Sequence, residues 1–110
     1  MKKPMPFIEE LQSTADRNVF VMMRYVDSPQ FAGIEQSLRG ALLEFGLIAR
    51  LAKDRAISDD LWENIRIYMA YARYGVAVFE EIDRRDFNPN ISLELGYMYA
   101  LGRRCLLLRR

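Results

Sequence analysis

One carboxyl group, that of Glu94, stands in a sequence context that suits chemistry. It follows the turn-rich residues Asn88-Pro89-Asn90 and lies in the first turn of an expected helix whose other residues are largely apolar. The positive end of a helix favours an ionised carboxylate and burial disfavours it; here we expect the helix end to win. Such a carboxylate suits attack on, or stabilisation of, a sugar carbon that becomes positive as its base leaves. The alternative, that Glu94 only stabilises its own helix, stays open.

Further side chains are expected to lie at the same site. Arg24 could bind a phosphate, and Tyr25 could stack on a base. Asn88 could hydrogen-bond ribose hydroxyls, although its context is also ordinary turn chemistry. Ser92 either caps the helix or points its hydroxyl at the ligand. The sequence therefore predicts Glu94 as the catalytic residue and a set of ligand-binding residues, namely Met23, Arg24, Tyr25, Asn88, Asn90 and Ser92.

The composition excludes several classes of function. The net charge is +1 and no basic block is long enough to attract nucleic acid. The chain has no His and a single Cys, Cys105, which we expect to be an inert buried thiol. A histidine base, a Cys-rich zinc site and a disulfide within the chain are excluded, and we expect neither a metal nor a bound cofactor. Because no signal peptide or membrane-spanning run is found, a cytoplasmic protein without membrane contact is expected.

Strand and helix patterns alternate along the chain. Strands are predicted at 18–23, 47–52, 76–79 and 105–108, and helices at 31–46, 58–75 and 90–102, after a short helical turn near 7–12. Ser58 and Asn90 are the expected N-caps, and Gly75 the stop of the second helix. This alternation predicts an α/β fold, a doubly wound parallel sheet with helices on both faces.

The order of the strands follows from one charged residue. Arg50 interrupts the second strand, and an edge strand tolerates a charge better than a central one. We therefore expect the order 2-1-3-4, with a ligand crevice at the carboxyl ends of the first and third strands. The loops 24–29 and 80–90 would border this crevice.

The chain reads as one domain, residues 18–110, preceded by an N-terminal segment, residues 1–17. The helix at 90–102 is apolar on nearly all sides, and the last strand forms a hydrophobic sheet edge. Both features predict a homo-oligomer that uses this strand and the helix surface over Leu93 and Tyr97. A chain cut from a longer protein, with a missing C-terminal segment over these surfaces, is the alternative.

Two of these segments also carry a family resemblance. Phe20-Val21-Met22-Met23-Arg24, together with Asn88 to Gly96 and the small residues up to Gly102, resembles the bacterial TIR-like, predicted nucleotide-binding proteins. The nucleoside 2-deoxyribosyltransferases are similar more distantly, and the match spans about residues 18–108. The resemblance implies a flavodoxin-like fold and a catalytic glutamate at Glu94 that acts on the N-glycosidic bond of NAD or a nucleoside. The chain departs from the family in Met23-Arg24-Tyr25, where a small residue or proline is usual, and in lacking a fifth strand and last helix.

Three hypotheses follow. The preferred one is a TIR-like domain that cleaves the nicotinamide–ribose bond of NAD, as substrate and not cofactor, after assembly in bacterial antiphage signalling. The second is a non-catalytic nucleotide-sensing or oligomerisation module. The third is an enzyme of the nucleoside 2-deoxyribosyltransferase type.

Overall fold

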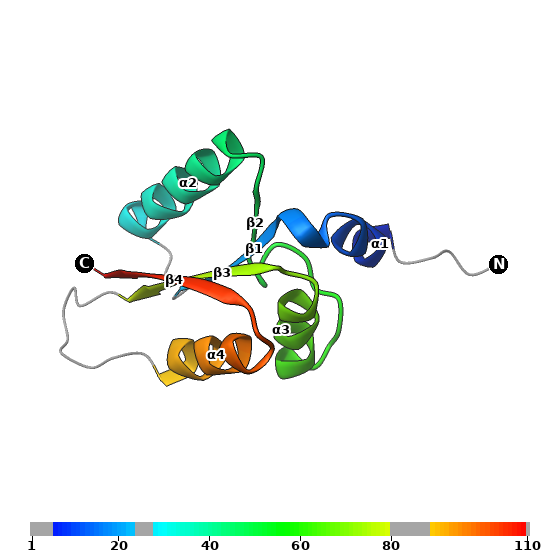
Figure 1. The fold of residues 1–110 in the computed structure, drawn as a ribbon. Coiled ribbons are helices and arrows are strands. Elements are labelled where there is room, and N and C mark those ends of the chain that lie inside the picture. Colours follow the sequence, from blue (N-terminus) through cyan, green and yellow to red (C-terminus); the bar gives the residue numbers. More distant parts are fainter. Residues whose placement is uncertain (1–5, 24–27, 80–88, 110) are drawn as a thin grey trace.

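Four parallel strands form one sheet with helices on both faces (Figure 1). The computed structural model describes residues 6–23, 28–79 and 89–109. Its elements, in chain order, are α1 (Pro6–Ser13), the 3-10 helix η1 (Ala15–Arg17), β1 (Asn18–Met22), α2 (Pro29–Glu44), β2 (Ile48–Arg50), α3 (Leu61–Ala70), β3 (Tyr74–Phe79), α4 (Pro89–Ala100) and β4 (Arg104–Arg109).

The strand order is β2-β1-β3-β4, and all three pairings are parallel. Val19 is in register with Ala49 on one side and with Tyr74 on the other. The predicted α/β fold and the order 2-1-3-4 are therefore confirmed. The chain crosses from β2, on one side of β1, to β3 on the other, so the direction of winding reverses between β1 and β3. Ligands of doubly wound sheets bind at the carboxyl ends of the strands at this point.

The two faces of the sheet carry separate cores. Because successive strand residues point to opposite faces, Val19 and Val21 pack in the core beneath α2. Phe20 and Met22 belong to the core on the opposite face, which contains Met98 of α4. Figure 1 shows α2 on one side of the sheet and α3 and α4 on the other.

The N-terminal segment is part of this second core. Leu11 of α1 is buried there, and Phe7 packs against the same cluster. Arg50, at the end of β2, is 8% exposed and forms an ion pair with Glu10 at 3.0 Å. The edge position predicted from Arg50 is confirmed, and its charge ties α1 to the sheet.

Helix α2 begins and ends at residues that suit those positions. The Ser28 side chain accepts a hydrogen bond from the Phe31 backbone N–H at 3.2 Å, and Pro29 opens the helix. Gly46 follows the helix with a φ of +75°, a conformation in which glycine avoids the strain of a side chain. The Phe45 side chain, directly after the helix, is 81% exposed.

Helix α3 is shorter than the predicted helix 58–75. Its N-cap is Asp60, whose carboxylate accepts from the Glu63 backbone N–H at 2.7 Å. The assignment of Ser58 as the cap was wrong: its hydroxyl accepts instead from the Asp60 backbone N–H, in the turn before the helix. The helix ends at Ala70.

Gly75 lies inside β3 and does not stop a helix, which corrects the prediction. A Cβ on this glycine would meet Cys105 Sγ and Met22 Cε at 2.9 Å, and Met98 Cε at 3.0 Å. Glycine is used here because α4 and the neighbouring strands approach the backbone closely. The sequence pattern did not reveal this, because the three contacts come from distant parts of the chain.

Strand β4 leaves apolar surface exposed. Leu106 and Leu107 are 58% and 51% exposed. Cys105 is half-buried, and burial raises the pKa of its thiol, so the thiol is protonated at neutral pH.

Across the described part of the chain, none of the helices combines the length and the apolar character that a membrane crossing requires.

Candidate active site

Glu94 lies on α4, the helix that follows β3. Because the strands are parallel, β1 and β3 end at the same edge of the sheet. Helix α4 is the next element after β3. Ile91 and Met98 are buried against the sheet. Glu94 is three residues after Ile91 and four before Met98, so the three share one face of the helix. The fold thus directs this carboxyl toward the core side of α4.

Burial dominates the electrostatics of Glu94. The side chain is half-buried, and loss of hydration raises the pKa of its carboxyl to about 7. Within residues 6–23, 28–79 and 89–109, no hydrogen bond or opposite charge offsets this effect. At neutral pH, therefore, the carboxylate and the carboxylic acid are present in comparable amounts.

The expectation that the helix end keeps Glu94 ionised was wrong. Helix α4 begins at Pro89, so its first turn contains no acidic residue and Glu94 lies in the second turn. The stabilising effect of a helix end falls off within the first turn, and burial therefore prevails. Asn90 lies inside the helix and is not its N-cap. Proline suits the first helical position because it has no N–H to leave unpaired.

The structure brings together only part of the predicted set. Ser92 is half-buried and Asn90 exposed, both on the same helix as Glu94. The Met23 side chain is buried in the core beneath α2, on the opposite face of the sheet from α4. The Met23 side chain is therefore not available to a ligand near Glu94. The predicted contacts Arg24, Tyr25 and Asn88 lie outside the described residues.

The surface expected over Leu93 and Tyr97 is partly covered by the chain itself. Leu93 is 60% exposed. The ring of Tyr97, however, packs edge-on against Trp62 of α3, with 5.6 Å between the ring centroids. Tyr97 therefore helps to hold α4 against α3, and this contact fixes the helix that carries Glu94.

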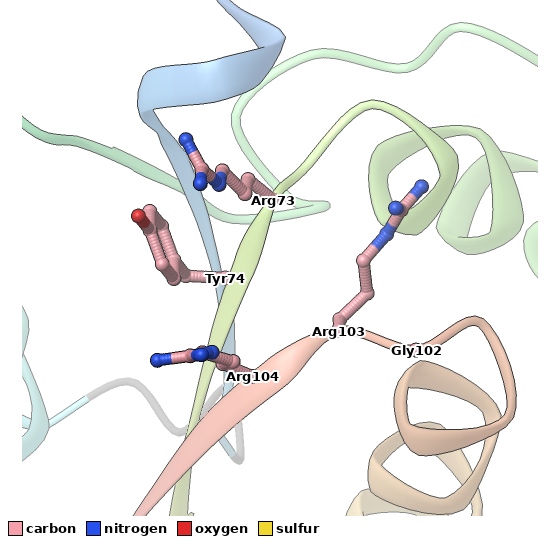
Figure 2. Close-up of a pocket in the computed structure, with 5 residues that line it drawn as sticks. All are labelled: Arg73, Tyr74, Gly102, Arg103 and Arg104. Carbon is pink, nitrogen blue, oxygen red and sulfur yellow. The ribbon is translucent and has the colours of Figure 1, made fainter.

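A cluster of arginines was missed by the sequence reasoning. Arg73, Arg103 and Arg104 line a pocket of about 380 Å³ with Tyr74 and Gly102 (Figure 2). A signal was present: each arginine lies where a strand begins, and neighbouring parallel strands begin at the same edge of a sheet.

An apolar hollow of about 600 Å³ lies between α2 and the strands, against Val78 and Leu108. Neither cavity is lined by Glu94.

Chemically, the site offers a carboxyl group that changes its charge near neutral pH. Its anion can attack an electron-poor carbon, and its acid form can protonate a leaving group. The described residues contain no group of three or more His, Cys, Asp or Glu side chains arranged to hold a metal ion.

Comparison with known proteins identifies a fold. No family model and no curated protein matches the chain. A solved structure of a 2-desoxiribosyltransferase from Leishmania mexicana is similar to it, with a TM-score of 0.68 and 16% sequence identity. The match covers 84% of this chain and 64% of that one, so the chain spans under two thirds of that protein.

At this identity the similarity establishes a shared flavodoxin-like α/β fold. The matched structure has the activity named in the more distant of the two family resemblances carried by the sequence, but at 16% identity the match identifies the fold alone. The TIR-like resemblance gains no support from it.

Proposed function

We propose that this chain acts on the N-glycosidic bond of a deoxynucleoside, with Glu94 as the catalytic carboxyl and transfer of the deoxyribosyl group as the reaction. The observation that carries the proposal is the half-buried Glu94 carboxyl, with its pKa raised to about 7, on the helix that follows β3. The shared fold with a 2-desoxiribosyltransferase supports the choice of substrate class.

The reaction needs two steps at one carbon atom. The Glu94 carboxylate attacks C1′ of the sugar, and the C1′–N bond breaks. The leaving base takes the electron pair of that bond and a proton from solvent. A second base then attacks C1′, releases the carboxylate and loses its proton. Water in place of the second base gives hydrolysis.

The raised pKa sets the pH dependence of such a step. Only the ionised form of Glu94 can attack C1′, and its fraction increases as pH rises through about 7. If Glu94 is the nucleophile, kcat/KM rises with pH and levels off above this value. If Glu94 donates a proton to the leaving base, kcat/KM falls over the same range.

Hydrolysis of NAD is a related reaction, because the nicotinamide–ribose link is also an N-glycosidic bond. The comparisons lend no support to NAD cleavage or to a role in antiphage signalling. The incubation described below therefore includes NAD, so that its cleavage can be detected. A non-catalytic nucleotide sensor would bind nucleosides without turnover in the same test.

The test is an incubation of the wild-type chain with a deoxynucleoside and a different free base, and separately with NAD, followed by mass spectrometry. We expect base exchange, reduced at least about 100-fold in Glu94→Gln. Glu63→Gln is the matched control, because it makes the same change at an exposed carboxyl on α3 and should retain the activity.

Three results would overturn the proposal. They are consumption of NAD without base exchange, binding of nucleosides without turnover, and full activity of a folded Glu94→Gln variant. Circular dichroism of each variant establishes that it is folded.

A further inference from the structure

The arginine pocket lies at the edge of the sheet where β3 and β4 begin. Tyr74 and Arg104 begin β3 and β4 and are in register with each other. Glu94, in contrast, is on the helix that follows the end of β3. The pocket has a volume of about 380 Å³, which lies within the usual range for sites that bind small molecules.

Two features of the backbone bring the arginines together. Arg73 directly precedes β3, and its guanidinium lies 5.4 Å from the centroid of the Tyr74 ring. Gly102, with a φ of +78°, turns the chain from α4 into β4 and so positions Arg103 and Arg104. Figure 2 shows Arg73, Tyr74 and Arg104 extending to one side of the strands, while Arg103 extends toward α3.

The charges of this cluster are not neutralised by the described part of the chain. Arg39, Arg50 and Arg66 each form an ion pair with a carboxylate there, whereas none is found for Arg73, Arg103 or Arg104. The net charge of the whole chain is only +1, so three arginines that line one pocket are a local feature of the fold.

Arg103 carries an additional signal. Its Nη2 donates to the Ala70 carbonyl oxygen at 3.0 Å, but its Nε is buried without a hydrogen-bond partner. A buried donor of a charged group without a partner is costly, because it has lost water and gained nothing in return. The Arg103 guanidinium therefore places a positive charge without a carboxylate partner in the described residues beside the pocket, on the side of α3.

We propose that this pocket binds a small molecule that carries a diphosphate or a similar multiply charged phosphate group. Guanidinium groups match phosphate oxygens in charge and in geometry, and each can donate two parallel hydrogen bonds. Arg73 and Arg104 supply the exposed donors, and Arg103 adds charge from the side of α3. This site is separate from the one that contains Glu94 and does not depend on the function proposed for it.

The experiment is calorimetric titration of the full chain with pyrophosphate at constant ionic strength. We expect saturable binding by the wild-type chain and binding at least tenfold weaker in Arg104→Gln. Arg66→Gln is the matched control, because it removes the same charge from an arginine on α3 that does not line the pocket. Its affinity should stay within twofold of wild type, and thermal unfolding shows that both variants are folded.

Several outcomes would overturn the proposal. One is the absence of saturable binding at millimolar pyrophosphate. Another is an equal loss of affinity in Arg104→Gln and Arg66→Gln, which would indicate general charge attraction. Binding of a single-stranded oligonucleotide at least tenfold tighter than pyrophosphate, at the same ionic strength, would replace the small molecule by nucleic acid.

Discussion

Arg50 and Glu94 are both ionisable side chains withdrawn from water, but their surroundings differ. Arg50 pairs with Glu10 at 3.0 Å and donates to the Asn18 Oδ1 and Thr14 Oγ1 atoms, each at 3.1 Å. Glu94 has no such partner in the described part of the chain, and burial raises the pKa of its carboxyl to about 7.

The difference separates a charge held by a network of side chains from a titratable group without one. The donors of Arg50 are engaged by three side chains of the N-terminal segment and β1, so this charge fixes the position of α1 relative to β2. The lone pairs and the exchangeable proton of the Glu94 carboxyl are not engaged by any described residue. A perturbed pKa without a structural partner is typical of functional sites, although structural networks perturb pKa values too.

The largest effect on stability is expected when the hydrogen-bond network around Arg50 is broken at Asn18. Asn18 is fully buried, donates to the Leu11 and Tyr71 carbonyl oxygens at 3.1 and 2.8 Å, and accepts from Arg50. Asn18→Leu would leave all of these groups unpaired, so we expect the free energy of unfolding to fall by about 3 to 5 kcal/mol. Urea denaturation measures it.

A control separates hydrogen bonding from packing at this position. Thr14→Val removes one hydroxyl at the half-buried edge of the same network, and its cost should be about 1 kcal/mol. If Asn18→Leu cost no more than Thr14→Val, the network would not hold the N-terminal segment, and the contrast with Glu94 would fail.

An intermediate effect is expected at the unpartnered site. The pKa of Glu94 is higher in the folded chain, at about 7, than in the unfolded chain, at about 4.5. The folded state therefore keeps a proton that the unfolded state releases. The contribution of this bound proton to the free energy of unfolding is fully present below pH 4.5 and is lost as pH rises through 7. Glu94→Gln should gain about 3 kcal/mol relative to wild type between pH 4.5 and pH 8.

Urea denaturation of both proteins at the two pH values measures this gain, because pH effects from the other groups cancel in the difference. A stability difference that is the same at pH 4.5 and pH 8 would show that Glu94 is hydrated or paired in the folded chain. Glu94 would then no longer differ from Arg50 as a group withdrawn from water without a partner.

The smallest effect is expected for a charge that has a partner but remains in water. Arg66 pairs with Glu63 on α3, and both side chains are more than 40% exposed. Because water screens such pairs, Arg66→Ala should shift the midpoint of thermal unfolding by less than about 3 °C. A larger loss, measured by circular dichroism, would mean that a partner matters even without burial.

Much of the fold was predictable because it depends on local patterns. The buried run in β1 and the periodic apolar residues of α2 predicted a strand and a helix without knowledge of their neighbours. Arg50 predicted the edge position of β2, and with it the strand order. Gly75 was misjudged because its role depends on Cys105, Met22 and Met98, which approach it only in the folded chain.

The candidate site was predictable in its position along the chain but not in its protonation state. The turn-rich residues before α4 and the lone acid that follows them pointed to Glu94. Its pKa depends on how deeply the helix packs and on where its first turn begins. The opening of the helix at Pro89 moved Glu94 out of the first turn, and burial then outweighed the helix end.

The sequence by itself determined the alternation of strands and helices and the winding of the sheet, and it pointed to Glu94 as the candidate carboxyl. These follow from the period of apolar residues and from the few residue types available for chemistry. Only the tertiary structure decided that Arg50 is neutralised, that Glu94 is half-buried with a raised pKa, and that Arg73, Arg103 and Arg104 share a pocket. The physical reason is that hydration and electrostatic pairing depend on distances between segments that are remote in the sequence.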